Sequence, residues 1–94
     1  MSIYESIEAG IYKNPNPYPA DIKDPKARKV KLILYYQKEA ECKEMFKKDA
    51  LEDLGLSNHP KADKLFDIAW ERGHASGYQS VWSVMIDLAP LLQD

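Results

Sequence analysis

Cysteine, histidine and glycine are all scarce in this chain of 94 residues, which has one cysteine, two histidines and four glycines. A single cysteine cannot form a disulfide within the chain, and it suits a reducing compartment. The net charge of −2 provides no overall field that would attract DNA or RNA. The HExxH, CxxC, GxSxG and Walker patterns are missing. We therefore expect no enzyme activity, no metal, no cofactor and no polymeric nucleic acid partner.

Long hydrophobic runs are also missing. The least charged stretch, residues 73–86, contains several serine and glutamine side chains and is too polar to span a bilayer. The first residues lack the basic and apolar regions of a signal peptide. The composition, 45% hydrophobic and 30% charged, is typical of a globular chain. We expect one cytoplasmic domain, residues 1–94, that does not associate with membranes.

Capping and turn signals predict the first part of this domain. The sequence Ser2-Ile3-Tyr4-Glu5 has the form of a capping box and predicts a short helix over residues 3–9. Three prolines follow within residues 14–19, and they favour an extended backbone. Residues 1–23 are therefore predicted to form a short N-terminal helix and a stiff, proline-rich arm.

Two longer helices are predicted after the arm. Asp24-Pro25 combines an N-cap residue with proline at the first helical position, and no breaker follows before Gly55. The segment 24–55 is therefore expected to contain a helix over about residues 25–54. The segment 58–94 is expected to contain one last helix, from about residue 59 into the high 80s. Together these elements predict an all-α fold, a long antiparallel helical hairpin with an N-terminal arm.

The predicted last helix carries more apolar surface than one partner helix can cover. Two apolar stripes advance by alternating threes and fours, which is the spacing of packed helix seams. After Arg72 the charged residues are Asp87 and Asp94. A monomer of this size would normally display more charge on such a helix. We therefore expect the hairpin to self-associate into a compact homo-oligomer.

Gly73 and Gly77 lie four residues apart in the middle of this predicted helix. Each glycine in a helix interior costs about 1 kcal/mol relative to alanine, so the pair needs a compensating reason. One reason is a close helix crossing. The other is a phosphate-bearing ligand, for which Arg72, His74 and Ser76 would provide donors. Both explanations remain open, and they are compatible.

The start of the second helix is unusually basic, and an aromatic arm precedes it. Five cations crowd a helix end that already carries partial positive charge, namely Lys23, Lys26, Arg28, Lys29 and Lys31. An anion would relieve this repulsion, whereas the alternative is a solvated turn partly neutralised by nearby aspartates. Tyr12 and Tyr18 on the arm could stack on a base, or both rings could pack against the hairpin.

Three segments resemble one known family: Ile11-Tyr12-Lys13-Asn14-Pro15, Asp24-Pro25-Lys26, and Arg72-Gly73-His74-Ala75-Ser76-Gly77-Tyr78. With the chain length, they resemble the phage anti-CBASS sponges, which are related to a small early protein of T-even phages. Those proteins are helical hairpins that assemble into compact hexamers and sequester cyclic nucleotides without cleaving them. The resemblance implies a homohexamer in the cytoplasm of an infected bacterium, antagonising CBASS immunity.

The resemblance also implies site residues. Tyr12 and Lys26 match a tyrosine and a lysine that line a cyclic dinucleotide pocket between protomers, for cGAMP-like ligands. Arg72 or Lys64 of a neighbouring protomer would complete that pocket. A separate cyclic trinucleotide pocket would involve Arg72, Gly73, His74, Ser76 and Gly77. The alternative function is a helical adaptor or inhibitor that binds a host protein through an exposed apolar face of the last helix, which would include Trp70, Tyr78 and Trp82.

Overall fold

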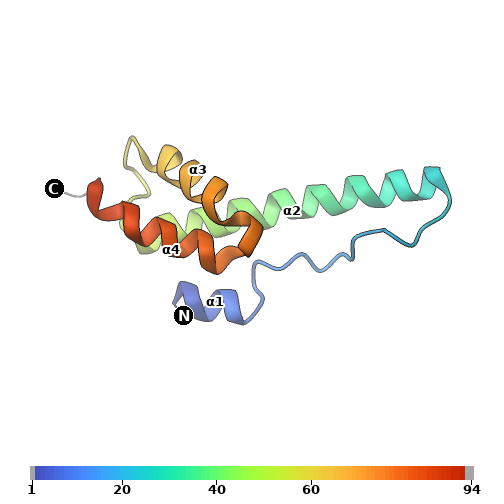
Figure 1. Cartoon of the computed structure of the whole chain (residues 1–94), viewed down its shortest axis with the longest axis horizontal. Helices are drawn as coiled ribbons and strands as arrows, with labels where there is room; N and C mark the ends of the chain where they lie inside the picture. Colours follow the sequence, from blue (N-terminus) through green and yellow to red (C-terminus); the bar gives the residue numbers. More distant parts are fainter. Residues whose placement is uncertain (1, 93–94) are drawn as a thin grey trace.

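The computed structural model describes residues 2–92, which fold into α-helices and short 3₁₀ turns and contain no strand (Figure 1). The all-α prediction is confirmed. In chain order the elements are α1 (Ile3–Glu8), α2 (Pro25–Asp53), α3 (Ala62–Gly73), η1 (His74–Ser76), α4 (Tyr78–Leu88) and η2 (Ala89–Leu91). No helix within residues 2–92 is long and apolar enough to cross a membrane.

The first two helices begin at the residues that the sequence predicts. At α1 the Ser2 hydroxyl accepts a hydrogen bond from the Glu5 amide at 3.2 Å, and the Glu5 carboxylate accepts one from the Ser2 amide at 3.5 Å. At α2 the Asp24 carboxylate accepts from the Lys26 amide at 3.3 Å, with Pro25 in the first turn. Side-chain caps thus satisfy amides that a helix start leaves free. The predicted caps of both helices are confirmed.

The prediction of a single last helix is wrong. Helix α3 ends at Gly73, the chain turns through η1, and α4 begins at Tyr78. Gly77 has φ +101°, a conformation that residues with a side chain rarely adopt. A Cβ atom on Gly73 would lie 2.6 Å from the backbone nitrogen of Val81. The glycine pair therefore serves a sharp turn and a close approach of α4 to α3 within one chain, where we predicted a continuous helix.

The core lies where α3 and α4, side by side, cross the C-terminal half of α2 (Figure 1). Phe46 from α2, Phe66 from α3, and Val81 and Met85 from α4 are almost fully buried there. Helix α1 closes one side through Ile3. Because three helices and the short α1 share this core, the molecule is a small helical cluster rather than the two-helix hairpin that the sequence predicts.

The N-terminal half of α2 projects away from this cluster, with the proline-rich arm running back beside it (Figure 1). None of the first 17 residues of α2, residues 25–41, is buried. The molecule measures 55 × 25 × 21 Å and has a radius of gyration of 15.4 Å. A compact chain of 100 residues has a radius of about 13 Å. The projecting half of α2 therefore makes the single chain elongated for its length.

Candidate functional site

Tyr12, the predicted stacking residue, is part of the core. Its side chain is 2% exposed, and its hydroxyl donates a hydrogen bond to Asp49 Oδ2 at 2.9 Å. Its ring contacts the edge of Phe46 and the tilted ring of Tyr78, with centroids 5.2 and 5.8 Å away. Burial, and then the hydrogen bond to Asp49, raises the pKa of Tyr12 to about 12. Of the two roles that the sequence allowed for this ring, the single chain adopts the packed one.

Lys26 lies far from Tyr12. It is exposed in the first turn of α2, whereas the Tyr12 hydroxyl is bonded to Asp49 near the other end of that helix. Asp49 is 23 positions after Lys26, which corresponds to roughly 35 Å along the helix axis. One chain therefore does not bring Tyr12 and Lys26 together. A pocket that contained both side chains would need two copies of the chain.

The residues around the glycine pair surround a small cavity of about 180 Å³, lined by Glu39, Trp70, His74, Gly77 and Tyr78. The His74 ring stacks on Trp70 with centroids 5.6 Å apart, and its Nδ1 lies 2.7 Å from the Trp70 carbonyl oxygen. The carboxylate of Glu39 shares the cavity lining, and a carboxylate opposes the approach of a phosphate. The cavity of the single chain is thus better suited to an uncharged ring than to a phosphate.

The other predicted residues of α3 and η1 lie apart from this cavity's lining. Arg72 and Ser76 are exposed and Gly73 is buried beneath α4. Lys64 lies eight residues before Arg72, roughly 12 Å along α3, and lines a different cavity between α3 and α4. The structure therefore places Arg72 and Lys64 at two separate positions on the surface, so they are not interchangeable partners for one pocket.

A larger cavity, about 310 Å³, lies between the arm and the projecting half of α2. It is lined by Asn16, Pro17, Tyr18, Pro19, Asp21, Ile22, Lys31 and Leu34. The Tyr18 ring packs against Tyr35 of α2, yet the side chain is 50% exposed and also forms part of the cavity wall. A tyrosine between two prolines, directly before the basic turn, was the sequence signal for this site.

The arm is held against α2 at defined points. The Asn14 side-chain amide donates to the Tyr35 carbonyl oxygen at 3.0 Å, and its Oδ1 accepts from the Asn16 amide at 2.9 Å. The Tyr18 ring meets the Tyr35 ring edge-on, with centroids 5.4 Å apart. Three prolines restrict the backbone between these contacts. The wall of the cavity is therefore positioned before a ligand arrives, which lowers the entropy lost on binding.

The cations beside this cavity are unneutralised in the part of the chain that the structure describes. All five are exposed: Lys23, Lys26, Arg28, Lys29 and Lys31. Both ion pairs of residues 2–92 lie elsewhere on the helices, between Lys38 and Glu41 and between Lys47 and Asp63. Asp24 is engaged in capping α2, while Asp21 lines the cavity itself. The basic end of α2 therefore keeps a net positive charge that can attract an anion.

A family model matches residues 1–93, and its description is "Family of unknown function (DUF8546)". The chain belongs to the DUF8546 family. No curated protein and no solved structure matched this chain. Within residues 2–92 of this DUF8546 chain, no group of three or more histidine, cysteine, aspartate or glutamate side chains is placed to hold a metal ion. The described residues thus gather five exposed cations at one end of α2, beside a cavity that Lys31, Asp21 and Tyr18 line.

Proposed function

We propose that this protein binds cyclic oligonucleotide messengers, cyclic dinucleotides and also cyclic trinucleotides, and sequesters them without cleaving them. In an infected bacterial cell this would deprive CBASS effectors of their activating ligand. The observation that carries the proposal is the basic end of α2, where five cations are exposed and one of them, Lys31, lines a preformed cavity together with Tyr18. The resemblance of three segments to the phage sponges supports the choice of ligand.

The chemistry of this region matches a cyclic nucleotide. Tyrosine offers a flat ring on which a base can stack, and each such contact contributes about 1–3 kcal/mol. Lys26 and Lys31 offer ammonium groups for the phosphates, and hydrogen bonds to charged groups contribute about 1.5–3 kcal/mol. The cavity of about 310 Å³ is at the small end of ligand pockets, which run from about 300 to 1,000 Å³. One chain would hold part of the ligand, and a second copy would enclose the rest.

The projecting half of α2 provides a surface for that second copy. Val30, Ile33, Leu34 and Tyr36 lie there with 48–58% of their side chains exposed. Val30, Ile33 and Leu34 have the spacing of one helix face, and such a face favours burial against another helix. In such an assembly Arg72 of one copy could reach Lys26 of another, because both side chains are exposed, whereas Tyr12 is buried in its own chain. We propose a homohexamer, as the resemblance implies.

Titration calorimetry with 3′,3′-cGAMP and with cyclic tri-adenylate tests the function and the site together. Lys26→Ala, Lys31→Ala and Tyr18→Ala should each weaken cyclic dinucleotide binding about tenfold or more, because each removes a contact of about 1.5 kcal/mol. Lys48→Ala, at an exposed position of α2 outside the cavity, is the matched control and should bind as the unchanged protein does.

The possible outcomes separate the function from the site. Failure to bind any cyclic di- or trinucleotide would refute sequestration. Binding that is unaffected in all three variants would refute the site but leave the function standing. Chromatography of the ligand released by denaturation should recover it intact, and recovery of linear nucleotides would show hydrolysis instead.

The alternative function, an adaptor that binds a host protein through an apolar face of the last helix, requires that face to be exposed. We expected Trp82 to belong to it, but Trp82 is 5% exposed, and Trp70 and Tyr78 are partly buried against the core. The aromatic patch of that hypothesis does not form in the single chain. We therefore retain nucleotide sequestration.

A further inference from the structure

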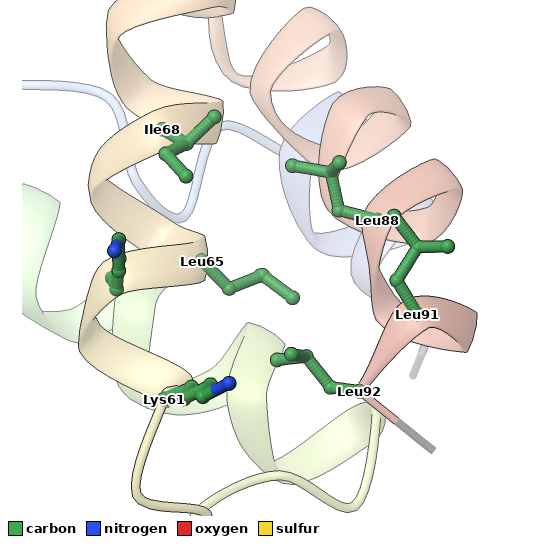
Figure 2. Close-up of a pocket in the computed structure, with 7 residues that line it drawn as sticks. Lys61, Leu65, Ile68, Leu88, Leu91 and Leu92 are labelled. Carbon is green, nitrogen blue, oxygen red and sulfur yellow. The ribbon is translucent and has the colours of Figure 1, made fainter. Parts of the chain in front are cut away.

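A third cavity lies between α3 and the end of α4. Figure 1 shows that these two segments belong to the cluster and lie away from the projecting end of α2. Its volume is about 250 Å³. Five aliphatic side chains and two lysines line it: Leu65, Ile68, Leu88, Leu91, Leu92, Lys61 and Lys64. Figure 2 shows Leu65 extending from α3 toward α4 and Leu92 extending back from beyond α4, with Leu88 above them. The cavity therefore has aliphatic walls on two sides.

The aliphatic side chains that line the cavity favour an aliphatic ligand. No aromatic side chain lines this cavity, which distinguishes it from the two cavities described above. Leu91 at its edge is 77% exposed, so apolar surface here remains in contact with water. Covering such surface releases about 25 cal/mol per Å². A methylene group occupies about the same volume as a water molecule, about 30 Å³. The cavity volume therefore corresponds to a chain of roughly eight carbon atoms.

The two lysines in the cavity lining, Lys61 and Lys64, favour a ligand with an anionic head group. Lys61 directly precedes α3, Lys64 lies in the first turn of that helix, and both line the cavity. In Figure 2 the Lys61 side chain extends along one end of the cavity toward Leu92, with its nitrogen on the side facing α4. Neither ammonium group has a carboxylate within 4 Å among residues 2–92. Asp63, in the same turn, pairs instead with Lys47 at 3.0 Å. Lysine stems also extend the apolar wall while the ammonium groups remain hydrated.

We propose that this cavity binds a medium-chain aliphatic carboxylate, with its hydrocarbon chain between Leu65, Ile68 and Leu88 and its carboxylate at Lys61 and Lys64. This inference is independent of the cyclic nucleotide site. No residue lines both this cavity and the one beside Tyr18. A protein of this kind would carry a lipid-derived acid on its cluster and a nucleotide at the far end of α2.

Octanoate is the probe for this site, and octanol is its uncharged analogue. In methyl-region NMR spectra, octanoate should shift the signals of Leu65, Ile68 and Leu88 in a saturable way, while those of Val30 and Ile33 on the projecting half of α2 stay in place. Octanoate should also bind several-fold more tightly than octanol, because only the acid meets the lysines.

Lys61→Glu should weaken octanoate binding about fivefold and leave octanol binding unchanged, since one partly exposed charge contact contributes about 1 kcal/mol. Lys61 is exposed, so this variant should fold normally. Lys48→Glu on α2 controls for the change in net charge. Ile68→Phe should fill the cavity and abolish binding of both compounds.

Three results would overturn the proposal. They are the absence of saturable octanoate binding, methyl shifts confined to residues outside this cavity, and equal weakening by Lys61→Glu and Lys48→Glu. If Ile68→Phe proves unstable, the two lysine variants still decide the matter. Cyclic nucleotide binding should be the same in Lys61→Glu and in the unchanged protein, so failure of one proposal is distinguishable from failure of the other.

Discussion

Tyr12 could either stack on a base or pack in the core, and its contacts in the structure show that it packs in the core. The ring packs against Phe46 of α2 and Tyr78 of α4, and its hydroxyl donates to Asp49, which is partly exposed. An apolar ring with a satisfied polar end is well suited to the edge of a core. Because the hydroxyl of Tyr12 is used inside the chain, its contribution to stability can be measured separately from any role in binding.

Tyr12→Phe should lower the free energy of unfolding at neutral pH by about 1 kcal/mol, because it removes one hydrogen bond and leaves the ring in place. For a domain of this size, that corresponds to a melting temperature lower by about 4–8 °C. Tyr4→Phe, at a side chain that is 46% exposed, is the matched control and should melt as the unchanged protein does.

The same variant should alter stability at alkaline pH. The pKa values of Tyr12 and Tyr78 are raised from 10.0 to about 12 in the folded chain. Their contribution to stability is therefore complete below pH 10 and is lost as the pH rises from 10 to 12, where the unfolded chain releases these protons first. Urea unfolding should show that the free energy of unfolding falls between pH 10 and pH 12 in both proteins. The fall should be smaller in Tyr12→Phe than in the unchanged protein, by roughly 2 kcal/mol. An identical loss in both proteins would contradict this assignment.

At the scale of elements, the break between α3 and α4 defines the shape of the cluster. The backbone of α4 passes so close to Gly73 that a Cβ atom there would lie within 2.9 Å of three backbone atoms, Val81 N, Ser80 C and Val81 Cα. Backbone atoms in a helix cannot move aside as the end of a flexible side chain can. The contact therefore requires glycine, and it brings the Trp70 and Tyr78 rings together across the turn at 6.0 Å.

Gly73→Ala should destabilise the protein by roughly 3 kcal/mol, because the added methyl group pushes α4 away from α3 and disturbs the packing of Val81 and Met85. Gly55→Asn is a suitable control. Gly55 also has a positive φ, +71°, but no atom lies within 4 Å of a Cβ built there, and asparagine tolerates this conformation. Thermal unfolding followed by circular dichroism compares the two. Similar melting temperatures for Gly73→Ala and the unchanged protein would show that the two helices are not in close contact.

The elements also show the limits of sequence patterns. Caps such as Ser2 and Asp24 depend on residues within one turn, so local spacing predicted them. The glycine pair could equally mark a crossing between two chains, a bound ligand or a turn. Local spacing does not distinguish these cases, because each places something close to the same backbone. The outcome depended on where Val81 lies in space.

At the scale of the molecule, the projecting half of α2 is a long helical segment with little packing against the rest of the chain. Its backbone is helical, yet residues 25–41 bury no side chain, and most helices in proteins are stabilised by packing of an apolar face. The elongated shape and the exposed apolar side chains together support self-association along this half of α2.

Ile33→Asp should therefore lower the mass measured by light scattering toward that of a single chain, 10.8 kDa. Ile33 is 49% exposed in the single chain, so the substitution should change the stability of a monomer by no more than about 0.5 kcal/mol. In an assembly the new carboxylate would be buried without a partner. Lys48→Asp, at an exposed position in the other half of α2, should keep the mass of the unchanged protein. A single-chain mass for the unchanged protein at all concentrations would refute self-association.

The sequence alone determined the helical class, the starts of α1 and α2, and the basic end of α2 beside an aromatic arm. These features depend on residues close together in the chain, where capping, proline geometry and charge act over one or two turns. The tertiary structure decided that Tyr12 packs in the core, that Tyr18 forms a cavity wall, and that the last helix folds back at Gly77. Each of these outcomes depends on contacts between segments far apart in sequence, and no local pattern records those contacts.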